Sequence, residues 1–280
     1  MDRRKFIGTA ATGAGVMMLA PGLLAAAAKV KHPIGFQTFP IRDMVAKDFA
    51  GTMKTMAGMG YQHTEMCYPK GYAGAGFAPL VDAKPADLKK MIEDAGLTCP
   101  SCHFGMNDLK NNFRECMDYA HGLGLTQVVT PGLETPGKTI DDFKQACGEL
   151  NRIAADIKKE GMATGLHNHE GEFKKIDGVL IYDAILEALD GKLVKMQFQT
   201  EVVKLGYNAA DYFRIYPGRF ISSHLSDWTA DKKQVPIGQG VIDWKEFFDT
   251  ANKTGVKNFF VEMDFDTYKD SATYIHGLLG

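Results

Sequence analysis

Amphipathic stretches that end in glycine and lead into a short apolar run recur along the chain. Gly60, Gly96, Gly124, Gly161 and Gly255 each close such a stretch, and apolar side chains follow within a residue or two. Glycine ends a helix well because it adopts the left-handed conformation without a clash of a Cβ atom. The pattern therefore predicts helices that end at these glycines and buried strands that follow them.

Eight short runs have the length and apolar character of buried strands. They are Ile34–Thr38, Tyr61–Met66, Thr98–His103, Thr126–Thr130, Ala163–Asn168, Lys195–Gln199, Phe220–Leu225 and Asn258–Glu262. Helical patterns lie between them, among them Pro85–Ala95, Asp141–Glu160, Val179–Leu189 and Trp244–Thr254, the last with Asp243 as a candidate cap. Alternating strands and helices imply a parallel sheet, which closes into a barrel at about eight repeats. We expect an α/β fold, a single (βα)₈ TIM barrel with a parallel eight-stranded inner sheet.

An open, doubly wound sheet is the alternative fold. It would usually carry a glycine-rich phosphate loop after its first strand, and the residues Gln37-Thr38-Phe39-Pro40 do not form one. Two longer irregular stretches, 69–83 and 227–240, follow the second and seventh predicted strands, and the first of them could serve as a lid.

The first 28 residues have the features of a targeting segment rather than of a barrel. Asp2-Arg3-Arg4-Lys5-Phe6 is followed by an uncharged run of small and apolar residues that ends in four alanines, Ala25 to Ala28. Paired arginines before Phe6 match a twin-arginine signal, and the alanines offer a cleavage site. We expect residues 1–28 to be a cleaved twin-arginine signal peptide and 29–280 to be a periplasmic catalytic domain. A membrane anchor is the alternative.

Charge and cysteine content narrow the choice of partners. The formal net charge is −2, and the chain has no cluster of lysine and arginine that could neutralise successive phosphates, so we expect no nucleic acid partner. Five cysteines do not make a complete disulfide framework. Cys99 and Cys102 have the spacing of a redox pair, but they fall inside a predicted strand, which favours buried thiols over an oxidised pair.

Polar residues gather at the carboxyl ends of the predicted strands, where a closed barrel brings them together. These residues are Gln37, His63, Glu65, His103, Thr130, His167, His169, Glu172, Gln199, His224, Asp227 and Glu262. Five of the eight histidines in the chain are among them, more than the one or two that chance would place there. Imidazole and carboxylate together are the usual ligands of Zn²⁺, Mn²⁺ and related ions. The sequence therefore predicts a site that holds one divalent metal ion, Mn²⁺, Zn²⁺ or Mg²⁺.

Several motifs carry a resemblance to a known family, and they run in order from Ile34 to about Asp266. They are Gly35-Phe36-Gln37, Leu166-His167-Asn168-His169-Glu170-Gly171-Glu172-Phe173, Tyr216-Pro217-Gly218-Arg219, His224-Leu225-Ser226-Asp227, Gly238-Gln239-Gly240-Val241-Ile242-Asp243-Trp244 and Val261-Glu262-Met263-Asp264. With them the chain resembles the xylose-isomerase-like barrel superfamily, the sugar phosphate isomerase/epimerase group.

The resemblance implies a set of metal ligands. Members of the superfamily typically hold one divalent ion with a glutamate, an aspartate, a histidine and a glutamate after strands five to eight. In this chain the corresponding residues are Glu172 or a neighbouring histidine, then Gln199, His224 and Glu262. Gln199 departs from the pattern because it replaces a carboxylate with a neutral amide, which should weaken metal binding and leave the ion more electrophilic.

The activity implied by the resemblance is isomerisation or epimerisation of a sugar or keto-sugar through removal of the proton α to a carbonyl. We expect Glu172, Glu262, His167 and His169 to supply the acid and base groups, and Gln37, Glu65, His103 and Asp227 to bind the carbohydrate substrate. Export favours an unphosphorylated substrate and makes the twin-arginine machinery a partner, and an oligomer is compatible with the sequence. A lyase or dehydratase acting on a keto-glycoside or cyclitol, and a non-catalytic carbohydrate-binding protein, are the alternatives.

Overall fold

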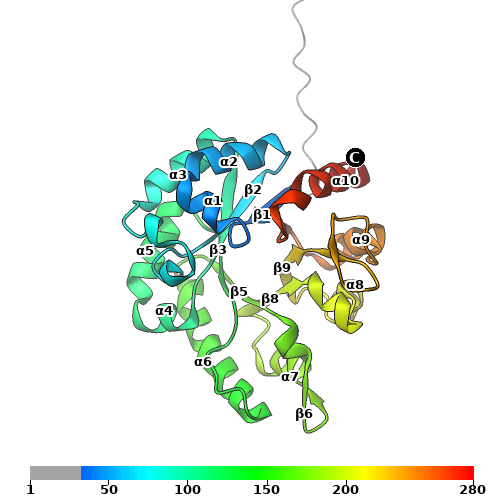
Figure 1. Cartoon of the computed structure of the whole chain (residues 1–280). Helices are drawn as coiled ribbons and strands as arrows, with labels where there is room; N and C mark the ends of the chain where they lie inside the picture. Colours follow the sequence, from blue (N-terminus) through cyan, green and yellow to red (C-terminus); the bar gives the residue numbers. More distant parts are fainter. Residues whose placement is uncertain (1–32) are drawn as a thin grey trace, which may run out of the picture.

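The computed structural model describes residues 33–280, and the predicted signal peptide lies outside them. Eight parallel strands close into a barrel in the order β1, β12, β9, β8, β5, β4, β3, β2, and helices surround it (Figure 1). The predicted single (βα)₈ barrel is confirmed. The strands are β1 Ile34–Gln37, β2 His63–Cys67, β3 Thr98–His103, β4 Gln127–Thr130, β5 Ala163–His167, β8 Val194–Gln199, β9 Phe220–Leu225 and β12 Asn258–Val261.

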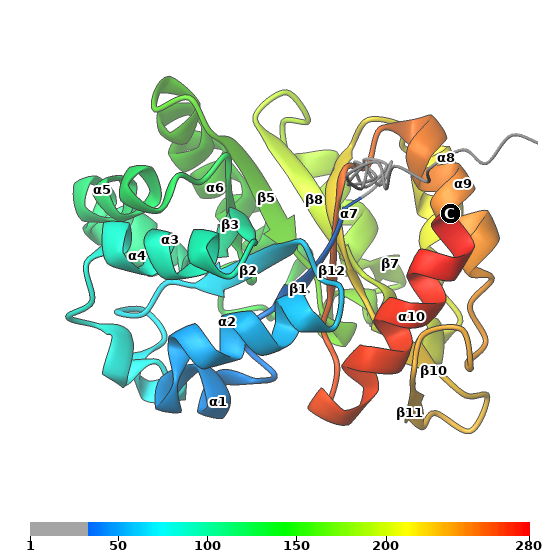
Figure 2. The same cartoon turned by 90° about the horizontal axis from the view of Figure 1, so that it is seen from above.

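Helices follow the strands and pack on the outside of the barrel (Figure 2). They are α1 Arg42–Lys47, α2 Phe49–Gly58, α3 Pro85–Asp94, α4 Met106–Asn111, α5 Phe113–Leu123, α6 Ile140–Lys159, α7 Ile181–Ala188, α8 Ala209–Ile215, α9 Trp244–Thr254 and α10 Tyr268–Leu279. Helix α10 packs beside the connection between α2 and β2, where the Tyr61 hydroxyl donates to the Tyr268 carbonyl and the two rings meet edge to face. These contacts join the last helix to the first strand-helix unit.

The glycines that were predicted to end helices do so. Gly60, Gly96, Gly124, Gly161 and Gly255 all have positive φ, between 82° and 103°, a region that side chains with a Cβ atom rarely adopt. Asp243 caps α9 as predicted, because its carboxylate accepts the backbone N–H of Glu246 at 2.9 Å. Local sequence signals therefore set where these helices end, and each strand begins within two residues of its predicted start.

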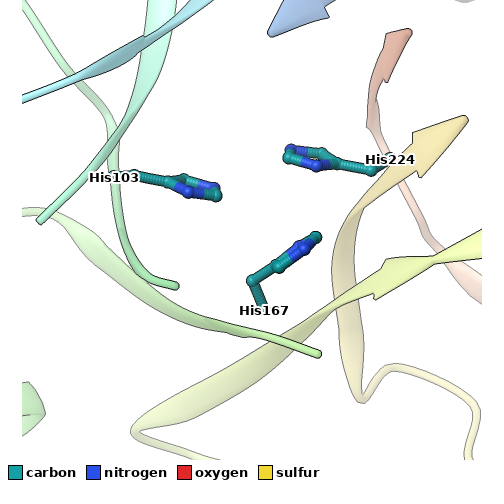
Figure 3. Close-up of side chains that lie close together, drawn as sticks. All are labelled: His103, His167 and His224. Atoms are coloured by element: carbon teal, nitrogen blue, oxygen red, sulfur yellow. The ribbon is translucent and has the colours of Figure 1, made fainter. Parts of the chain in front are cut away.

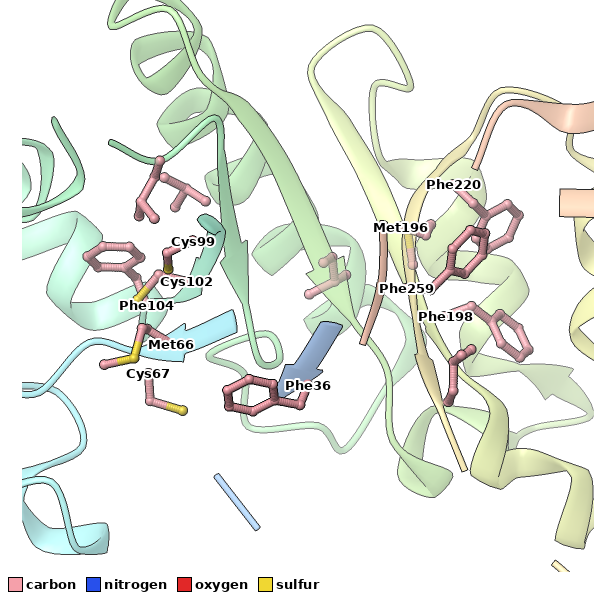
Figure 4. Close-up of a cluster of buried hydrophobic side chains, with 14 of the residues drawn as sticks. Phe36, Met66, Cys67, Cys99, Cys102, Phe104, Met196, Phe198, Phe220 and Phe259 are labelled. Carbon is pink, nitrogen blue, oxygen red and sulfur yellow. The ribbon is translucent and has the colours of Figure 1, made fainter. Parts of the chain in front are cut away.

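Apolar side chains fill the layer between the strands and the helices, which we call the outer layer (Figure 4). Phe198 of β8 is typical: it is fully buried, and its ring meets those of Phe173, Tyr182, Tyr212, Phe213 and Phe220. All five cysteines are buried, and none of them, Cys99 and Cys102 of β3 included, forms a disulfide in this structure. Burial of this layer supplies the main driving force for the fold.

The two irregular stretches have different structures. Residues 69–83 contain only two short 3₁₀ turns, η1 Ala73–Ala75 and η2 Ala78–Leu80. Residues 227–240 include an antiparallel pair, β10 Asp227–Trp228 and β11 Gln234–Val235. A second small pair, β6 Lys175–Ile176 and β7 Val179–Leu180, replaces the first turn of the helix predicted from Val179. Within residues 33–280, no helix combines the length and apolarity needed to cross a bilayer.

Candidate active site

Glu65, fully buried inside the barrel, is the centre of a hydrogen-bond network near the carboxyl ends of the strands. Its carboxylate accepts from Gln37 Nε2 at 2.8 Å, Ser101 Oγ at 2.5 Å and Gln197 Nε2 at 2.8 Å. Two histidines, His103 and His224, also contact it through Nε2. Burial opposes ionisation of Glu65, but these histidines outweigh it and hold its pKa well below the usual range. Glu65 is therefore a buried carboxylate whose charge is compensated by its neighbours.

His224 lies between two carboxylates. Its Nε2 atom contacts Glu65, and its Nδ1 atom lies 2.9 Å from Glu262 Oε2. Burial disfavours the charged imidazole, but Glu262 and Glu65 together raise the pKa of His224 to about 10. His224 is therefore an imidazolium at neutral pH, hydrogen-bonded at both nitrogens.

Glu262 is the carboxylate on the open side of this arrangement. Its side chain is 18% exposed, whereas that of Glu65 is 0% exposed. Gln199 Nε2 donates to the same Glu262 oxygen at 2.5 Å, so both His224 and Gln199 hold the carboxylate in place. Burial raises the pKa of Glu262, but the charge of His224 and its hydrogen bond lower that pKa by more, so the net shift is downward. Glu262 is thus an ionised carboxylate within reach of solvent.

Three histidines from three strands converge beside these carboxylates: His103 from β3, His167 from β5 and His224 from β9 (Figure 3). One nitrogen atom from each lies within 4.8 Å of the other two, and all three side chains are buried. The Nδ1 atom of His167 is buried and has no hydrogen-bond partner among residues 33–280. Burial and the neighbouring histidines hold the pKa of His167 well below its usual range, so its imidazole is neutral.

The donor set and its charge fit a divalent cation. Glu65 and Glu262 contribute two negative charges and the His224 imidazolium one positive charge, which leaves these three groups with one net negative charge. A dication that replaced the proton of His224 would neutralise them. Two further buried atoms near the cluster that could bind a metal ion, His167 Nδ1 and Gln199 Oε1, lack hydrogen-bond partners within the described chain. Buried polar atoms without partners are expected where a bound ion or ligand completes the site.

The predicted residues Glu172 and His169 lie at the edge of this cluster. The Glu172 carboxylate accepts the backbone N–H of His169 at 2.8 Å and closes the short turn η3, Glu170–Phe173. It lines a small space between His167 and helix α7, beside Tyr182. The exposed His169 ring meets that of His167 at 4.8 Å between centroids. At the end of β5, the residue that points into the cluster is therefore His167.

Asp227 and His63 are also placed apart from the cluster. The buried Asp227 carboxylate accepts from the N–H groups of Gly238 and Gly240, at 2.9 and 3.0 Å, and from Trp244 Nε1 at 2.8 Å. These bonds favour a role in holding the loop after β9. His63 was counted among the strand-end histidines, and this is wrong: it begins β2 at the amino end of the barrel, where Nδ1 meets Thr98 Oγ1.

Two residues of the network were missed in the sequence, Gln197 and Ser101. Gln197 bridges the site, because Nε2 donates to Glu65 while Oε1 lies 2.8 Å from His103 Nε2. A signal was present in the alternation of Met196, Gln197, Phe198 and Gln199, because alternate residues of a barrel strand face inward. Seven of the predicted residues lie together at the site: Gln37, Glu65, His103, His167, Gln199, His224 and Glu262. Their catalytic and binding roles remain predictions.

Comparison with known proteins places this barrel in a family. Residues 53–277 match the model of the xylose isomerase-like TIM barrel family. The chain belongs to this family. The resemblance inferred from the motifs is therefore confirmed. A search of curated protein sequences gave no significant match.

Solved structures share the fold of this family member at low sequence identity. A sugar phosphate isomerase/epimerase from Parabacteroides distasonis is 22% identical with a TM-score of 0.78, over 94% of this chain and 100% of that one. A D-allulose 3-epimerase from Methylomonas sp. is 14% identical with a TM-score of 0.65, over 88% and 98%. A probable 3-DHS dehydratase of petrobactin synthesis from Bacillus anthracis is 10% identical with a TM-score of 0.67, over 87% and 98%.

Proposed function

We propose that this chain is an enzyme that isomerises or epimerises an unphosphorylated sugar or keto-sugar. The observation that carries the proposal is the position of Glu262, an ionised carboxylate that is 18% exposed and held by His224 and Gln199. A general base needs both ionisation and access to its substrate, and Glu262 has both. Its neighbour Glu65, fully buried, supports His224 from the opposite side.

In the proposed reaction Glu262 removes the proton on the carbon next to the substrate carbonyl. The negative charge that develops on the carbonyl oxygen gives an enediolate. Return of the proton by Glu262 to the neighbouring carbon yields the isomer, and delivery of a proton to the opposite face by a second acid, Glu172 or His169, yields the epimer. His224 contacts the Glu262 carboxylate and holds it in position before the transfer. Gln37 and His103, which hold Glu65, complete the polar wall of the site.

A divalent metal ion is part of the proposal. Of the ligands expected from the sequence, Gln199, His224 and Glu262 would hold it, and His103 and His167 would add two imidazoles, with Glu172 at the edge of the site. When bound, such an ion supplies Lewis-acid polarisation of the substrate carbonyl and hydroxyl oxygens. The residues of the chain then orient the sugar and move the proton.

Location defines the proposed substrate class. Residues 1–28 carry the features of a twin-arginine signal, so we place the enzyme in the periplasm, with that export machinery as a partner. Sugar phosphates are mainly cytoplasmic metabolites, which favours a free sugar or a keto-glycoside as substrate.

A lyase or dehydratase is the second candidate, and the pair His167 and His169 favours it. Their rings are 4.8 Å apart, and His169 is exposed at the open side of the site, where an imidazole could protonate a departing hydroxyl or glycosyl oxygen. The two candidates share the first proton transfer and differ in the fate of the enediolate.

Incubation of the metal-loaded protein with free sugars and 3-keto-glycosides in deuterated water, with NMR as the readout, tests the proposal. Deuterium at one carbon of a rearranged sugar supports isomerase or epimerase activity, and loss of a substituent from the neighbouring carbon supports the lyase. Binding of a sugar without deuterium incorporation at any carbon, for every sugar tested, would contradict both and indicate a binding protein.

A further inference from the structure

We propose that the site prefers a cation of the zinc class, Zn²⁺ or Co²⁺, to Mg²⁺ and Mn²⁺ by a wider margin than a carboxylate-rich site of the same fold. This inference rests on the proposed function, since it concerns the metal that the enzyme would use. It depends on which donor atoms the chain brings together.

Nitrogen donors dominate the cluster. His103, His167 and His224 each offer a ring nitrogen, and these nitrogens lie within 4.8 Å of one another (Figure 3). In a tetrahedral zinc site with bonds of about 2.0–2.1 Å, ligand nitrogens stand about 3.3 Å apart. A small inward movement of the three side chains therefore suffices. Imidazole suits Zn²⁺ and Co²⁺, whereas Mg²⁺ takes oxygen ligands and keeps much of its water.

Anionic oxygen donors are scarce at the same place. Gln199 presents a neutral carbonyl oxygen, and that atom is buried without a partner among the described residues. The Glu172 carboxylate lies at the edge of the cluster and accepts the backbone N–H of His169 through Oε2. Glu65 already accepts from Gln37, Ser101 and Gln197. Of the two carboxylates that contact these histidines, Glu65 and Glu262, only Glu262 is partly exposed, at 18%.

The consequence is a site in which three imidazoles lie beside one partly exposed carboxylate. Binding of Mg²⁺ and Mn²⁺ weakens most when carboxylates are replaced by neutral ligands, because these ions depend on negative charge and on oxygen ligands. Binding of Zn²⁺ and Co²⁺ weakens least, because nitrogen ligands bind these ions well. Any N/O site favours Zn²⁺ over Mn²⁺, so the informative quantity is the change in the ratio of their dissociation constants when the donors are changed.

The experiment compares metal affinities of the chelator-stripped full chain with those of a variant in which oxygen donors are restored, His167→Glu combined with Gln199→Asp. Dissociation constants for Zn²⁺, Co²⁺, Mn²⁺ and Mg²⁺ are measured by competition with a metal indicator, and circular dichroism confirms folding of each protein. We expect the ratio of the Mn²⁺ to the Zn²⁺ constant to fall by roughly 10- to 100-fold in this variant, the size of effect seen when the surroundings of metal ligands change.

A single substitution, His103→Asn, tests the third imidazole, and His121→Asn is its matched control, because His121 is exposed on α5 and paired with Glu160. We expect His103→Asn to weaken Zn²⁺ and Co²⁺ binding by roughly 100-fold or more and to change the visible spectrum of bound Co²⁺, with Mg²⁺ affinity little altered. His121→Asn should leave both unchanged.

An unchanged Mn²⁺ to Zn²⁺ ratio in the oxygen-restored variant, or wild-type Co²⁺ affinity and spectrum in folded His103→Asn, would overturn the inference. Its failure is separable from failure of the proposed function. Incorporation of deuterium into a sugar would uphold the function whichever metal is preferred, and the metal affinities are measured without substrate.

Discussion

Gln197 and Phe198 are neighbours in strand β8 but belong to different regions of the molecule. Phe198 faces the outer layer, where aromatic rings pack around it. Gln197 faces the barrel interior, where it joins what we call the inner network: Gln37, Glu65, Ser101, His103, Gln197, Gln199, His224 and Glu262. The outer layer tolerates changes that preserve volume and apolarity. The inner network depends on a partner for each charge and hydrogen bond, because an unpaired polar group inside a protein is costly.

This difference separates stability from activity. The outer layer gains free energy in proportion to the apolar area it buries, without regard to direction. The inner network contributes less net stability, because its hydrogen bonds replace bonds to water. What the inner network provides is a fixed arrangement of charges at the carboxyl end of the barrel. We therefore expect substitutions in the outer layer to act on unfolding and those in the inner network to act first on the site.

The largest expected effect is on turnover, from Glu262→Gln. The amide cannot accept a proton as the carboxylate does, so kcat should fall by roughly 10³-fold, in the middle of the range for general bases. The measurement is the rate of deuterium incorporation into the active sugar. Glu187→Gln, exposed on α7, is the control. Near-normal turnover of folded Glu262→Gln would remove Glu262 from the reaction.

Phe198→Ala should have the largest effect on stability. Its ring is fully buried among five other aromatic rings, and its removal leaves a cavity, so we expect a loss of about 3–5 kcal/mol in the free energy of unfolding in urea. Ile215→Ala, at a side chain that is 65% exposed, should cost less than about 0.5 kcal/mol. If Phe198→Ala lowered kcat per folded molecule as much as Glu262→Gln does, the proposed separation between the two regions would be wrong.

The outer layer could largely be predicted from the sequence, because its signals are local. Glycines with positive φ end the helices, Asp243 caps α9, and all eight strands lie within two residues of their predicted bounds. His63 shows where the reasoning failed. Its strand was predicted to begin two residues earlier, so His63 appeared to lie nearer the carboxyl end, although it is the first residue of β2.

The inner network could be predicted only in part, because residues distant in sequence make it. That Glu65, His224 and Glu262 share hydrogen bonds depends on the register of β2, β9 and β12, which no local pattern fixes. Gln197 was missed because a glutamine inside an apolar run resembles an ordinary strand position. The bond by which the Glu172 carboxylate closes its own turn depends on the backbone of η3, and its predicted role as a metal ligand stays a prediction.

The dependence of stability on pH should distinguish the two regions by a few kcal/mol. The pKa of His224 is about 10 in the folded chain and about 6.5 when unfolded. Its contribution is therefore fully present below about pH 6.5 and is lost as the pH rises towards 10. For the chelator-treated protein, we expect the free energy of unfolding in urea to fall over this window. His224→Asn should show a shallower slope, whereas Phe198→Ala should keep the wild-type slope. Identical slopes in all three proteins would show that His224 is not held as an imidazolium.

The smallest effect is expected from Gln197→Leu, which keeps the volume of the side chain and removes its polar atoms. Glu65 loses one donor, and His103 loses the oxygen 2.8 Å from its Nε2 atom. We expect a loss of about 1–3 kcal/mol, the cost of leaving a buried polar group short of a partner, although leucine is the more apolar residue. Gln145→Leu, exposed on α6, is the matched control and should be nearly neutral. Urea unfolding measures both. If Gln197→Leu were more stable than the wild type, burial would outweigh hydrogen bonding inside the barrel, and the inner network would obey the same rule as the outer layer.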